Sequence, residues 1–340
     1  METLGLAIDT TFDDTSVALL RGTRQVLSNK TLSQYKDHEA FGGVIPERAS
    51  RRHLEVIHPL IQDALKEGGA AFDQLDWIAV SHKPGLLGSI LVGLTVAKSL
   101  AFLLNRPLIG INHIEAHPYA NFLGNSPLAQ ALANGQNPFP LLHLVAAGGH
   151  TLLIYQRDHF QWEIVGRSLD DAAGECVDKA AKMFGHPMPG GPVVDRLAMA
   201  HPPGDVAFPR PLLNDPGLDF SFSGLKTALR YHLEAHPQAP EGPTLAAYFQ
   251  AVCDVLTAKT LRAARRLKVE RITLSGGLCA SQKLREEFRR AADQEGLELF
   301  VPPPALCTDN AAMVACLGAF RHQAGRHDSL ALDGESNLLG

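Results

Sequence analysis

The sequence predicts an α/β fold made of two similar halves, and three observations carry this prediction. Short apolar runs of strand length alternate with longer segments of helical periodicity, a pattern typical of layered α/β proteins. Each half opens with the same unit, a strand, a small polar turn and a second strand. The length of 340 residues is enough for two compact domains. We expect an N-terminal lobe at 1–135 and a C-terminal lobe with helical insertions at 136–340.

The first half opens with a strand, an acidic, threonine-rich turn and a second strand, at residues 4–8, 9–15 and 16–20. The matching strand, Gly-Gly-His-Thr turn and strand of the second half lie at residues 141–147, 148–151 and 152–155. Thr15 and Thr151 occupy equivalent places in the two units. This correspondence predicts a duplicated fold.

Further elements follow each hairpin in alternation. In the first half we expect a helix within 46–66, a strand at 77–81, a helix within 86–104 and a strand at 108–111. In the second half we expect a helix at 171–184 and a longer helix within 244–267. A strand at 271–274, a helix after Ser281, a strand near 297–301 and a last helix from about Asp309 follow.

The composition is that of an ordinary globular protein. Hydrophobic residues make up 45% and charged residues 20%, which excludes a disordered chain, a fibre or a disulfide scaffold. The 31 Lys and Arg against 36 Asp and Glu give a net charge of −5. Binding to a nucleic acid would therefore depend on a local basic patch.

The five cysteines are an odd number without a C-x-x-C pair, which argues against a disulfide framework and a structural zinc cluster. A reducing cytoplasm is the expected location. The N-terminus has no basic segment followed by an apolar stretch, and Lys98 interrupts the apolar region 86–104. We therefore expect neither a signal peptide nor a membrane span.

His113 and His117 are four residues apart, which on a helix places both imidazoles on one face at a spacing used for metal binding. Glu115 would lie about 200° round the helix, so this is not the H-E-x-x-H of a zinc protease. A third ligand must come from elsewhere, and Asp309 in the segment 307–310 is the best candidate. The alternatives are a surface histidine pair and an Asp309 that caps the last helix.

The helix predicted at 171–184 has an apolar stripe opposite a polar face that contains Asp171, Glu175, Asp178 and Lys182. That face points into water or into a cleft. Two basic clusters are either solvated helix faces or an RNA-binding patch. They comprise Arg48, Arg51, Arg52 and His53, and Lys259, Arg262, Arg265, Arg266 and Lys268.

The two hairpin turns, and the strand at 271–274 followed by Ser-Gly-Gly, resemble the actin, Hsp70 and sugar-kinase superfamily. The resemblance implies a two-lobed fold with a ligand cleft between the lobes and nucleotide phosphates at the hairpin turns. The glycines Gly276 and Gly277 would let backbone approach an adenosine closely.

Eight segments in this order resemble the universal family of tRNA adenosine threonylcarbamoyltransferases, formerly called O-sialoglycoprotein endopeptidases. They are 9–15, 112–117, 148–151, 170–179, 189–195, 219–227, 275–281 and 307–312. The resemblance implies transfer of the threonylcarbamoyl group of threonylcarbamoyl-AMP to the exocyclic amine of the adenosine next to the anticodon, with release of AMP. The tRNAs would be those that read codons beginning with A.

The same resemblance implies roles for particular residues. The ligands of one divalent metal ion, iron(II) first and zinc(II) second, would be His113, His117 and Asp309. The substrate would contact Val145, Ala146, Ala147, Gly148, Gly149, Asp178, Gly191, Asp195 and Ser281. Asp13 is the candidate catalytic residue, either for proton removal or for ordering an ion. The family acts with a paralogous dimerising subunit and a small ATPase subunit, while a separate enzyme makes the adenylate.

The sequence departs from the family pattern at several positions. In the first motif, usually E-T-S-C-D-E-T, four positions are replaced by Asp9, Thr11, Phe12 and Asp14. Ala147 stands where serine is usual, and Ser281 stands where asparagine is usual.

Two rival functions are open at this point. A metalloprotease would need a general-base glutamate beside the histidines, and Glu115 faces the other way on a helix. A noncatalytic actin-like nucleotide-binding scaffold would need the phosphate turns but not the three metal ligands.

Overall fold

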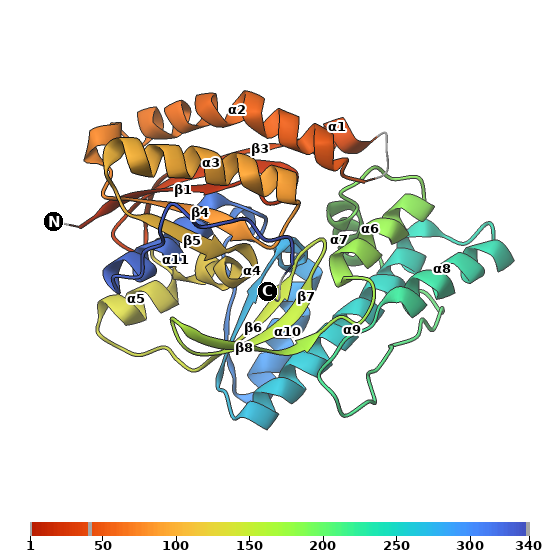
Figure 1. Cartoon of the computed structure of the whole chain (residues 1–340). Coiled ribbons are helices and arrows are strands. Elements are labelled where there is room, and N and C mark those ends of the chain that lie inside the picture. Colours follow the sequence, from red (N-terminus) through yellow and green to blue (C-terminus); the bar gives the residue numbers. More distant parts are fainter. Residues whose placement is uncertain (1, 40–42, 338–340) are drawn as a thin grey trace. The chain divides into compact units, whose positions relative to one another are not determined.

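The structure is a computed structural model that describes residues 2–39 and 43–337 (Figure 1). The chain divides into two compact units. Unit 1 contains residues Met1–Gln136 and Asp309–Gly340, and unit 2 contains Asn137–Thr308. Each unit is built around one five-stranded sheet in the described part of the chain.

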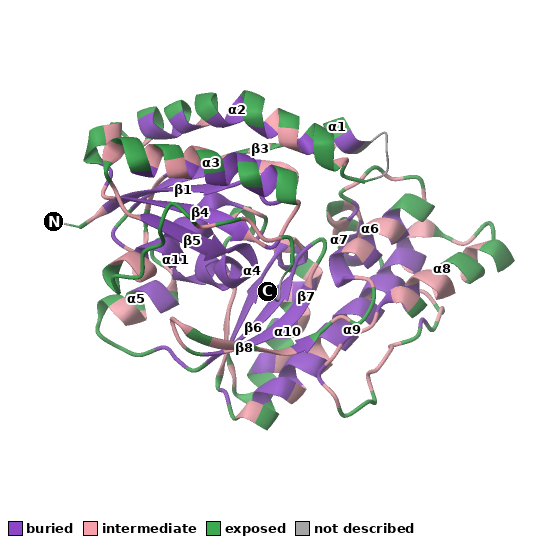
Figure 2. Cartoon of the chain, viewed as in Figure 1, coloured by how far each residue is buried: buried purple, intermediate pink, exposed green. Residues whose placement is uncertain are grey.

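The sheet of unit 1 has the strand order β3-β2-β1-β4-β5. Its strands are β1 (Leu4–Asp9), β2 (Asp14–Arg21), β3 (Gln25–Ser33), β4 (Trp77–Lys83) and β5 (Leu108–Asn112). The first three form an antiparallel meander, while β4 and β5 run parallel to β1. All residues of β1 and β5 are buried, as Figure 2 shows, so helices must cover both faces of this sheet.

The helices of unit 1 are α1 (Tyr35–Glu39), α2 (Pro46–Glu67), α3 (Leu87–Leu104), α4 (His113–Ala116), α5 (Pro127–Ala133) and α11 (Ala311–Gln323). Two short 3-10 helices, η1 (Phe72–Gln74) and η2 (His117–Phe122), complete it. The helices α2 and α3 lie side by side (Figure 1). In α2, the buried residues Val56, Ile57, Ile61 and Leu65 recur at helical spacing and pack into the core of unit 1.

Among the described helices, α3 is long and apolar enough to cross a membrane by length and composition alone. In the structure it packs against α2, β1 and β4. Its residues Val92, Leu94, Ala97 and Ala101 belong to the hydrophobic core of unit 1. This packing accounts for the apolar residues on the core-facing side of α3, while Leu87, Leu91, Phe102 and Leu103 remain exposed.

Unit 2 repeats the topology of unit 1. Its strands are β6 (Leu141–Ala146), β7 (Thr151–Asp158), β8 (Gln161–Arg167), β9 (Arg271–Ser275) and β10 (Glu298–Phe300). The order β8-β7-β6-β9-β10 and the directions of the strands match those of unit 1 one for one. The predicted duplication is therefore confirmed.

The helices of unit 2 are α6 (Ala173–Met183), α7 (Gly191–Ala200), α8 (Ser223–Ala235), α9 (Glu241–Leu267) and α10 (Gln282–Glu295). Two 3-10 helices, η3 (Gly277–Ala280) and η4 (Pro304–Leu306), follow β9 and β10. The long helix α9 is buried at most positions and packs against α6, α7 and α10. It therefore forms the centre of the helical layer of this unit.

Among the differences from the expectations, two concern the segments that contribute to the sites described below. Residues 309–340 belong to unit 1 rather than to the C-terminal lobe, because residues 311–319 of α11 are buried against β1, β2, β4 and β5. The segment 188–192 leads into a helix, α7, that the sequence did not predict. Pro192 lies in the first turn of that helix, where its missing N–H has no helical partner to lose.

Candidate functional site

Three side chains that could hold a metal ion meet in unit 1. One ligand atom from each of His113, His117 and Asp309 lies within 4.8 Å of the others. His113 Nε2 is 3.6 Å from Asp309 Oδ2, and His117 Nε2 is 3.4 Å from Asp309 Oδ1. Both imidazoles are buried, which argues against a surface histidine pair.

Local structure after β5 positions the two histidines. Asn112, the last residue of β5, caps α4 by accepting hydrogen bonds from the N–H groups of Ile114 and Glu115. The helix lasts one turn and continues as the 3-10 helix η2, which begins at His117. The histidines are thus brought together by two short successive helices rather than by one face of a single long α-helix.

Neighbouring residues show which groups are excluded from this cluster. Glu115 accepts a hydrogen bond of 3.1 Å from Arg321, so its carboxylate is engaged with α11. The N-cap of α11 is Asn310, whose Oδ1 accepts from the N–H of Met313 at 3.1 Å. The alternative in which Asp309 caps the last helix is therefore wrong.

Asp9 contacts the imidazole nitrogen of His113 that does not face Asp309. Its Oδ2 is 2.7 Å from His113 Nδ1, and both residues are buried. Burial alone would lower the pKa of His113, but Asp9 and Asp309 raise it well above its ordinary value. Burial likewise opposes ionisation of Asp9, yet the attraction of His113 leaves the pKa of Asp9 below its ordinary value.

Two adjacent carboxylates lie at the first hairpin turn. Burial raises the pKa of Asp13 above its ordinary value and raises the pKa of Asp14 to about 7. Asp14 Oδ1 is buried and has no hydrogen-bond partner among the residues described. Asp13 is the predicted catalytic residue, whereas Asp14 was noted in the sequence only as a departure from the family pattern. The two successive acids are the sequence signal that could have indicated both.

Unit 2 contains a cavity of about 740 Å³. Five of the nine predicted substrate residues line it, namely Gly148, Asp178, Gly191, Asp195 and Ser281. The cavity wall also includes Arg196 and Met199 of α7, Gly277 of η3 and Thr308. Gly148 follows β6 and Gly277 follows the parallel strand β9, so the cavity lies at the carboxyl ends of these strands.

The other four predicted substrate residues lie outside the cavity lining. Val145 and Ala146 are buried in β6, and Ala147 is buried directly after it. Gly149 is exposed at the hairpin turn. Their side chains therefore do not form the wall of this cavity.

Both carboxylates of the cavity also hold backbone in place. Asp178 Oδ1 accepts hydrogen bonds from Gly190 at 2.8 Å and Gly191 at 3.1 Å, at the start of α7. Asp195 accepts from the N–H groups of Gln282 and Lys283, at the start of α10. The pKa of Asp178 is raised by burial despite its two backbone donors.

Glycines keep parts of the cavity wall free of side chains. A Cβ atom built at Gly148 or Gly191 would meet no atom within 4 Å, and one at Gly277 would meet only Thr308 Cγ2, at 3.9 Å. Gly276 has a φ of +93°, and its Cβ would lie 2.5 Å from the carbonyl of Ala146. Glycine is therefore required at 276 by conformation and contact, whereas the other three leave open space.

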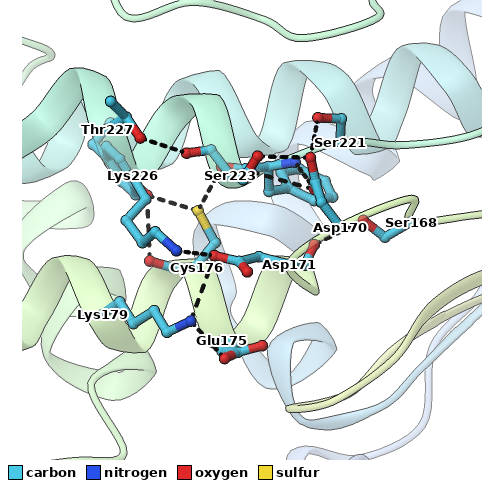
Figure 3. A network of polar contacts seen from close by, with 12 residues as sticks. Ser168, Asp170, Asp171, Glu175, Cys176, Lys179, Ser221, Ser223, Lys226 and Thr227 are labelled. Carbon is cyan, nitrogen blue, oxygen red and sulfur yellow. Dashed lines mark hydrogen bonds and ion pairs between the residues drawn. The ribbon is translucent and has the colours of Figure 1, made fainter.

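A polar network joins α6 to α8 (Figure 3). Asp171 accepts from Lys226 at 2.6 Å and lies 3.5 Å from Lys179, which pairs with Glu175 at 2.6 Å. Asp170 accepts from the N–H groups of Phe222 and Ser223, at the start of α8. Of the polar face predicted for α6, Asp171 therefore holds the segment 219–227, whereas Asp178 holds the start of α7.

Both basic clusters are largely paired within the chain. Lys259 is buried and donates to the carbonyls of Asp215 and Gly217, while Arg262 donates to the carbonyls of Asp215 and Leu213. Arg265 pairs with Glu295. In the other cluster Arg51 and Arg52 pair with Glu47 and Glu55, and His53 is buried beside Thr15. Neither cluster is a bare basic patch.

Comparison with known proteins identifies the family. The model of the family described as TsaD, tRNA N6-adenosine threonylcarbamoyltransferase, matches residues 25–316. The chain belongs to this family. The enzyme of that name from Symbiobacterium thermophilum is 48% identical over 331 residues, covering 96% of this chain and 94% of the relative. The one from Geobacter sulfurreducens is 46% identical over 345 residues, covering 99% and 98%. As a member, the chain is a transferase that modifies adenosine in tRNA.

Two solved structures confirm the actin-like fold. Full-length HypF, in a phosphate- and nucleotide-bound form, matches with a TM-score of 0.59 and 13% identity, covering 96% of this chain and 56% of HypF. Component A of the Acidaminococcus fermentans (R)-2-hydroxyglutaryl-CoA dehydratase matches with a TM-score of 0.53 and 13% identity, covering 95% and 99%. At this identity the likeness shows the fold alone.

Proposed function

We propose that the chain transfers the threonylcarbamoyl group of threonylcarbamoyl-AMP to the exocyclic amine of the adenosine adjacent to the anticodon, releasing AMP. The tRNA substrates are those that read codons beginning with A. The meeting of His113, His117 and Asp309 in a member of this transferase family carries the proposal. In the reaction the amine nitrogen bonds to the carbonyl carbon, the bond from that carbon to the phosphate oxygen breaks, and the amine loses a proton.

The cavity of unit 2 is proposed to bind the adenosine part of the adenylate. A volume of about 740 Å³ lies within the range of small-ligand sites. Its backbone walls at Gly148, Gly191 and Gly277 let a flat ring approach the main chain. The nucleotide-bound form of HypF, which shares the fold, is consistent with a nucleotide ligand. Asp178 and Asp195 keep the starts of α7 and α10 in place around this ligand.

The donor set of unit 1 fits one divalent ion, iron(II) or zinc(II). Two imidazoles and one carboxylate leave coordination positions open, as a catalytic or substrate-binding site requires. Such an ion supplies Lewis-acid stabilisation of the negative charge that develops on the carbonyl oxygen. Burial keeps bulk water from the imidazoles of His113 and His117.

A carboxylate of the first hairpin turn is proposed to take the proton from the attacking amine. Asp13 is our primary candidate, and Asp14 beside it is the second. The raised pKa of each makes it a better proton acceptor than an exposed carboxylate. Single-turnover rates of Asp13→Asn and Asp14→Asn distinguish the two, because the variant that loses the base is the one in which transfer slows.

The chain is proposed to act with a paralogous dimerising subunit and a small ATPase subunit, in a reducing cytoplasm. Five large apolar side chains remain exposed on α2 and α3, and they support a partner interface there: Leu54, Leu87, Leu91, Phe102 and Leu103. The five cysteines are all free and buried, which is consistent with a reducing compartment.

Reconstitution tests this proposal. The purified chain, its two partner subunits, threonylcarbamoyl-AMP and a tRNA that reads codons beginning with A should yield threonylcarbamoyladenosine. Nucleoside analysis of the digested tRNA by mass spectrometry measures the product. A complete mixture that forms no modified adenosine would overturn the proposal, and omission of the adenylate is the control.

A further inference from the structure

The two oxygens of the Asp9 carboxylate have different partners. Oδ1 accepts two hydrogen bonds from Thr11, at 3.1 Å from the backbone N–H and at 2.8 Å from the hydroxyl. Oδ2 lies 2.7 Å from His113 Nδ1. Asp9, Thr11 and His113 are all buried, so water does not replace these contacts.

This arrangement determines which imidazole nitrogen carries a proton. Because the carboxylate is an acceptor only, the group facing Oδ2 must be a donor, which requires Nδ1–H. The single hydroxyl proton of Thr11 goes to Asp9, so the Thr11 oxygen, 3.1 Å from Nδ1, also faces this N–H as an acceptor. A neutral His113 then has its lone pair on Nε2, the nitrogen on the side of Asp309.

We propose that Asp9, held by Thr11, is a positioning residue that fixes the tautomer of His113 with Nε2 available for the metal ion. The inference rests on the proposed metal site and deepens it. It assigns a role to the end of β1, which lies 104 residues before His113 in the chain and supplies no ligand itself.

An asparagine at position 9 gives the sharpest test because its two atoms are not equivalent. The two donors of Thr11 would select the amide oxygen for the place of Oδ1, and the NH2 group would then face His113 Nδ1. A donor there requires an unprotonated Nδ1, so the imidazole proton moves to Nε2 and blocks metal binding. Asp9→Ala removes the partner without imposing the wrong tautomer.

Which of these two variants binds metal more weakly therefore distinguishes tautomer control from general structural damage. Loss of an outer partner typically weakens metal affinity about 10- to 100-fold, and we expect Asp9→Ala to lie in this range. Asp9→Asn, although closer in size to the native residue, should bind metal at least about tenfold more weakly than Asp9→Ala. Asp9→Glu keeps a carboxylate and should recover part of the affinity.

The experiment measures zinc affinity of the full chain by competition with a chromophoric chelator, with His117→Ala as the ligand-loss reference and circular dichroism to confirm folding. Asp9→Asn binding as tightly as Asp9→Ala or the native chain would overturn the positioning role while leaving the metal site intact. A native chain that binds no zinc, iron(II) or cobalt(II), or a His117→Ala variant with native affinity, would instead overturn the proposed site.

A second measurement uses the native sequence and does not depend on how the variants fold. Long-range proton–nitrogen correlation of the zinc-loaded, 15N-histidine-labelled chain, with His113→Gln to assign its signals, reports the protonated nitrogen. We expect a proton on Nδ1 and the metal on Nε2. Metal coordination through Nδ1 of His113 would contradict the proposal.

Discussion

The hydroxyl of Ser281 donates a hydrogen bond of 2.6 Å to Asp195 Oδ1. The same hydroxyl oxygen accepts from the N–H of Leu284 at 3.1 Å and so caps α10. One serine therefore ties the start of α10 to α7 along the wall of the cavity. Its only proton is already donated, so Ser281 positions the cavity wall more than it donates to a ligand.

This relationship predicts that Ser281→Ala weakens both stability and adenylate binding. Loss of an N-cap side chain reduces the free energy of unfolding by about 1 kcal/mol. The Michaelis constant for threonylcarbamoyl-AMP should rise more than the turnover number falls, because α10 shifts but no reacting group is lost. Urea unfolding and steady-state kinetics check both effects, and Ser281→Thr, which keeps the hydroxyl, is the control. An unchanged Michaelis constant in Ser281→Ala would show that the hydrogen bond between Ser281 and Asp195 does not shape the ligand site.

The open space at Gly191 predicts a variant that blocks the cavity without unfolding the chain. A side chain at this position meets no protein atom at its Cβ, so Gly191→Val should fold and fill space meant for the ligand. Binding of AMP, measured by calorimetry, should fall at least about tenfold, which corresponds to about 1.4 kcal/mol.

Gly224→Val is the matched control for this prediction. Gly224 also lies in the first turn of a helix, α8, and its Cβ would make only an ordinary contact of 3.7 Å with Pro211. AMP affinity should be unchanged in that variant. If both valine variants lose affinity equally, the cavity is not the nucleotide site.

The buried His143 predicts a pH dependence of stability. Burial lowers its pKa to about 4, although the hydrogen bond with Gln156 acts in the opposite direction and raises the pKa. Since the unfolded chain takes up this proton near pH 6.5 and the folded chain does not, stability is complete above that pH and declines toward pH 4. The loss in free energy of unfolding attributable to this residue is about 3 kcal/mol. Urea unfolding of His143→Gln should show a shallower decline over the same interval, whereas an equal slope would exclude His143 as the cause.

The second basic cluster predicts different outcomes for two neighbouring arginines. Arg262→Glu would place a carboxylate against the carbonyls of Leu213 and Asp215, so the free energy of unfolding should fall by about 1–3 kcal/mol. Arg266 is exposed, and no hydrogen bond or ion pair involves it within the described residues, so Arg266→Glu should change stability by less than about 0.5 kcal/mol. Urea unfolding of both variants checks this, and equal losses would show that the carbonyl contacts do not matter.

The sequence predicted the elements with strong local patterns. Apolar runs such as 4–8 and 141–147 mark strands buried on both faces, and α2 shows a clear amphipathic stripe. The edge strands β3 and β8 were missed, because they are only partly buried and carry many polar residues. The same absence of a local signal explains why α11 was placed in the wrong lobe, since its partners are strands far away in the chain.

The site, like the fold, combines features that have a local signal in the sequence with features that have none. The spacing of His113 and His117 is visible in the sequence, which also offered Asp309 as the best candidate for a third ligand, and the family resemblance assigned all three to one metal ion. The contacts that position these groups join residues far apart, as Asp9 with His113 and Asp195 with Ser281 do. No local pattern in one sequence indicates such pairs, and they require the folded chain.

The central claim is that His113, His117 and Asp309 hold a metal ion on which transfer depends. Asp309→Asn keeps the size of the side chain and removes its charge, while Glu115→Gln alters a neighbouring carboxylate that is engaged with Arg321. The decisive measurement is the metal content of each purified chain by mass spectrometry, together with threonylcarbamoyladenosine formed in the reconstituted system. We predict that Asp309→Asn loses most of its metal and at least about 100-fold in transfer rate, and that Glu115→Gln keeps both near the native level. Full metal content and full transfer activity in Asp309→Asn would contradict the account.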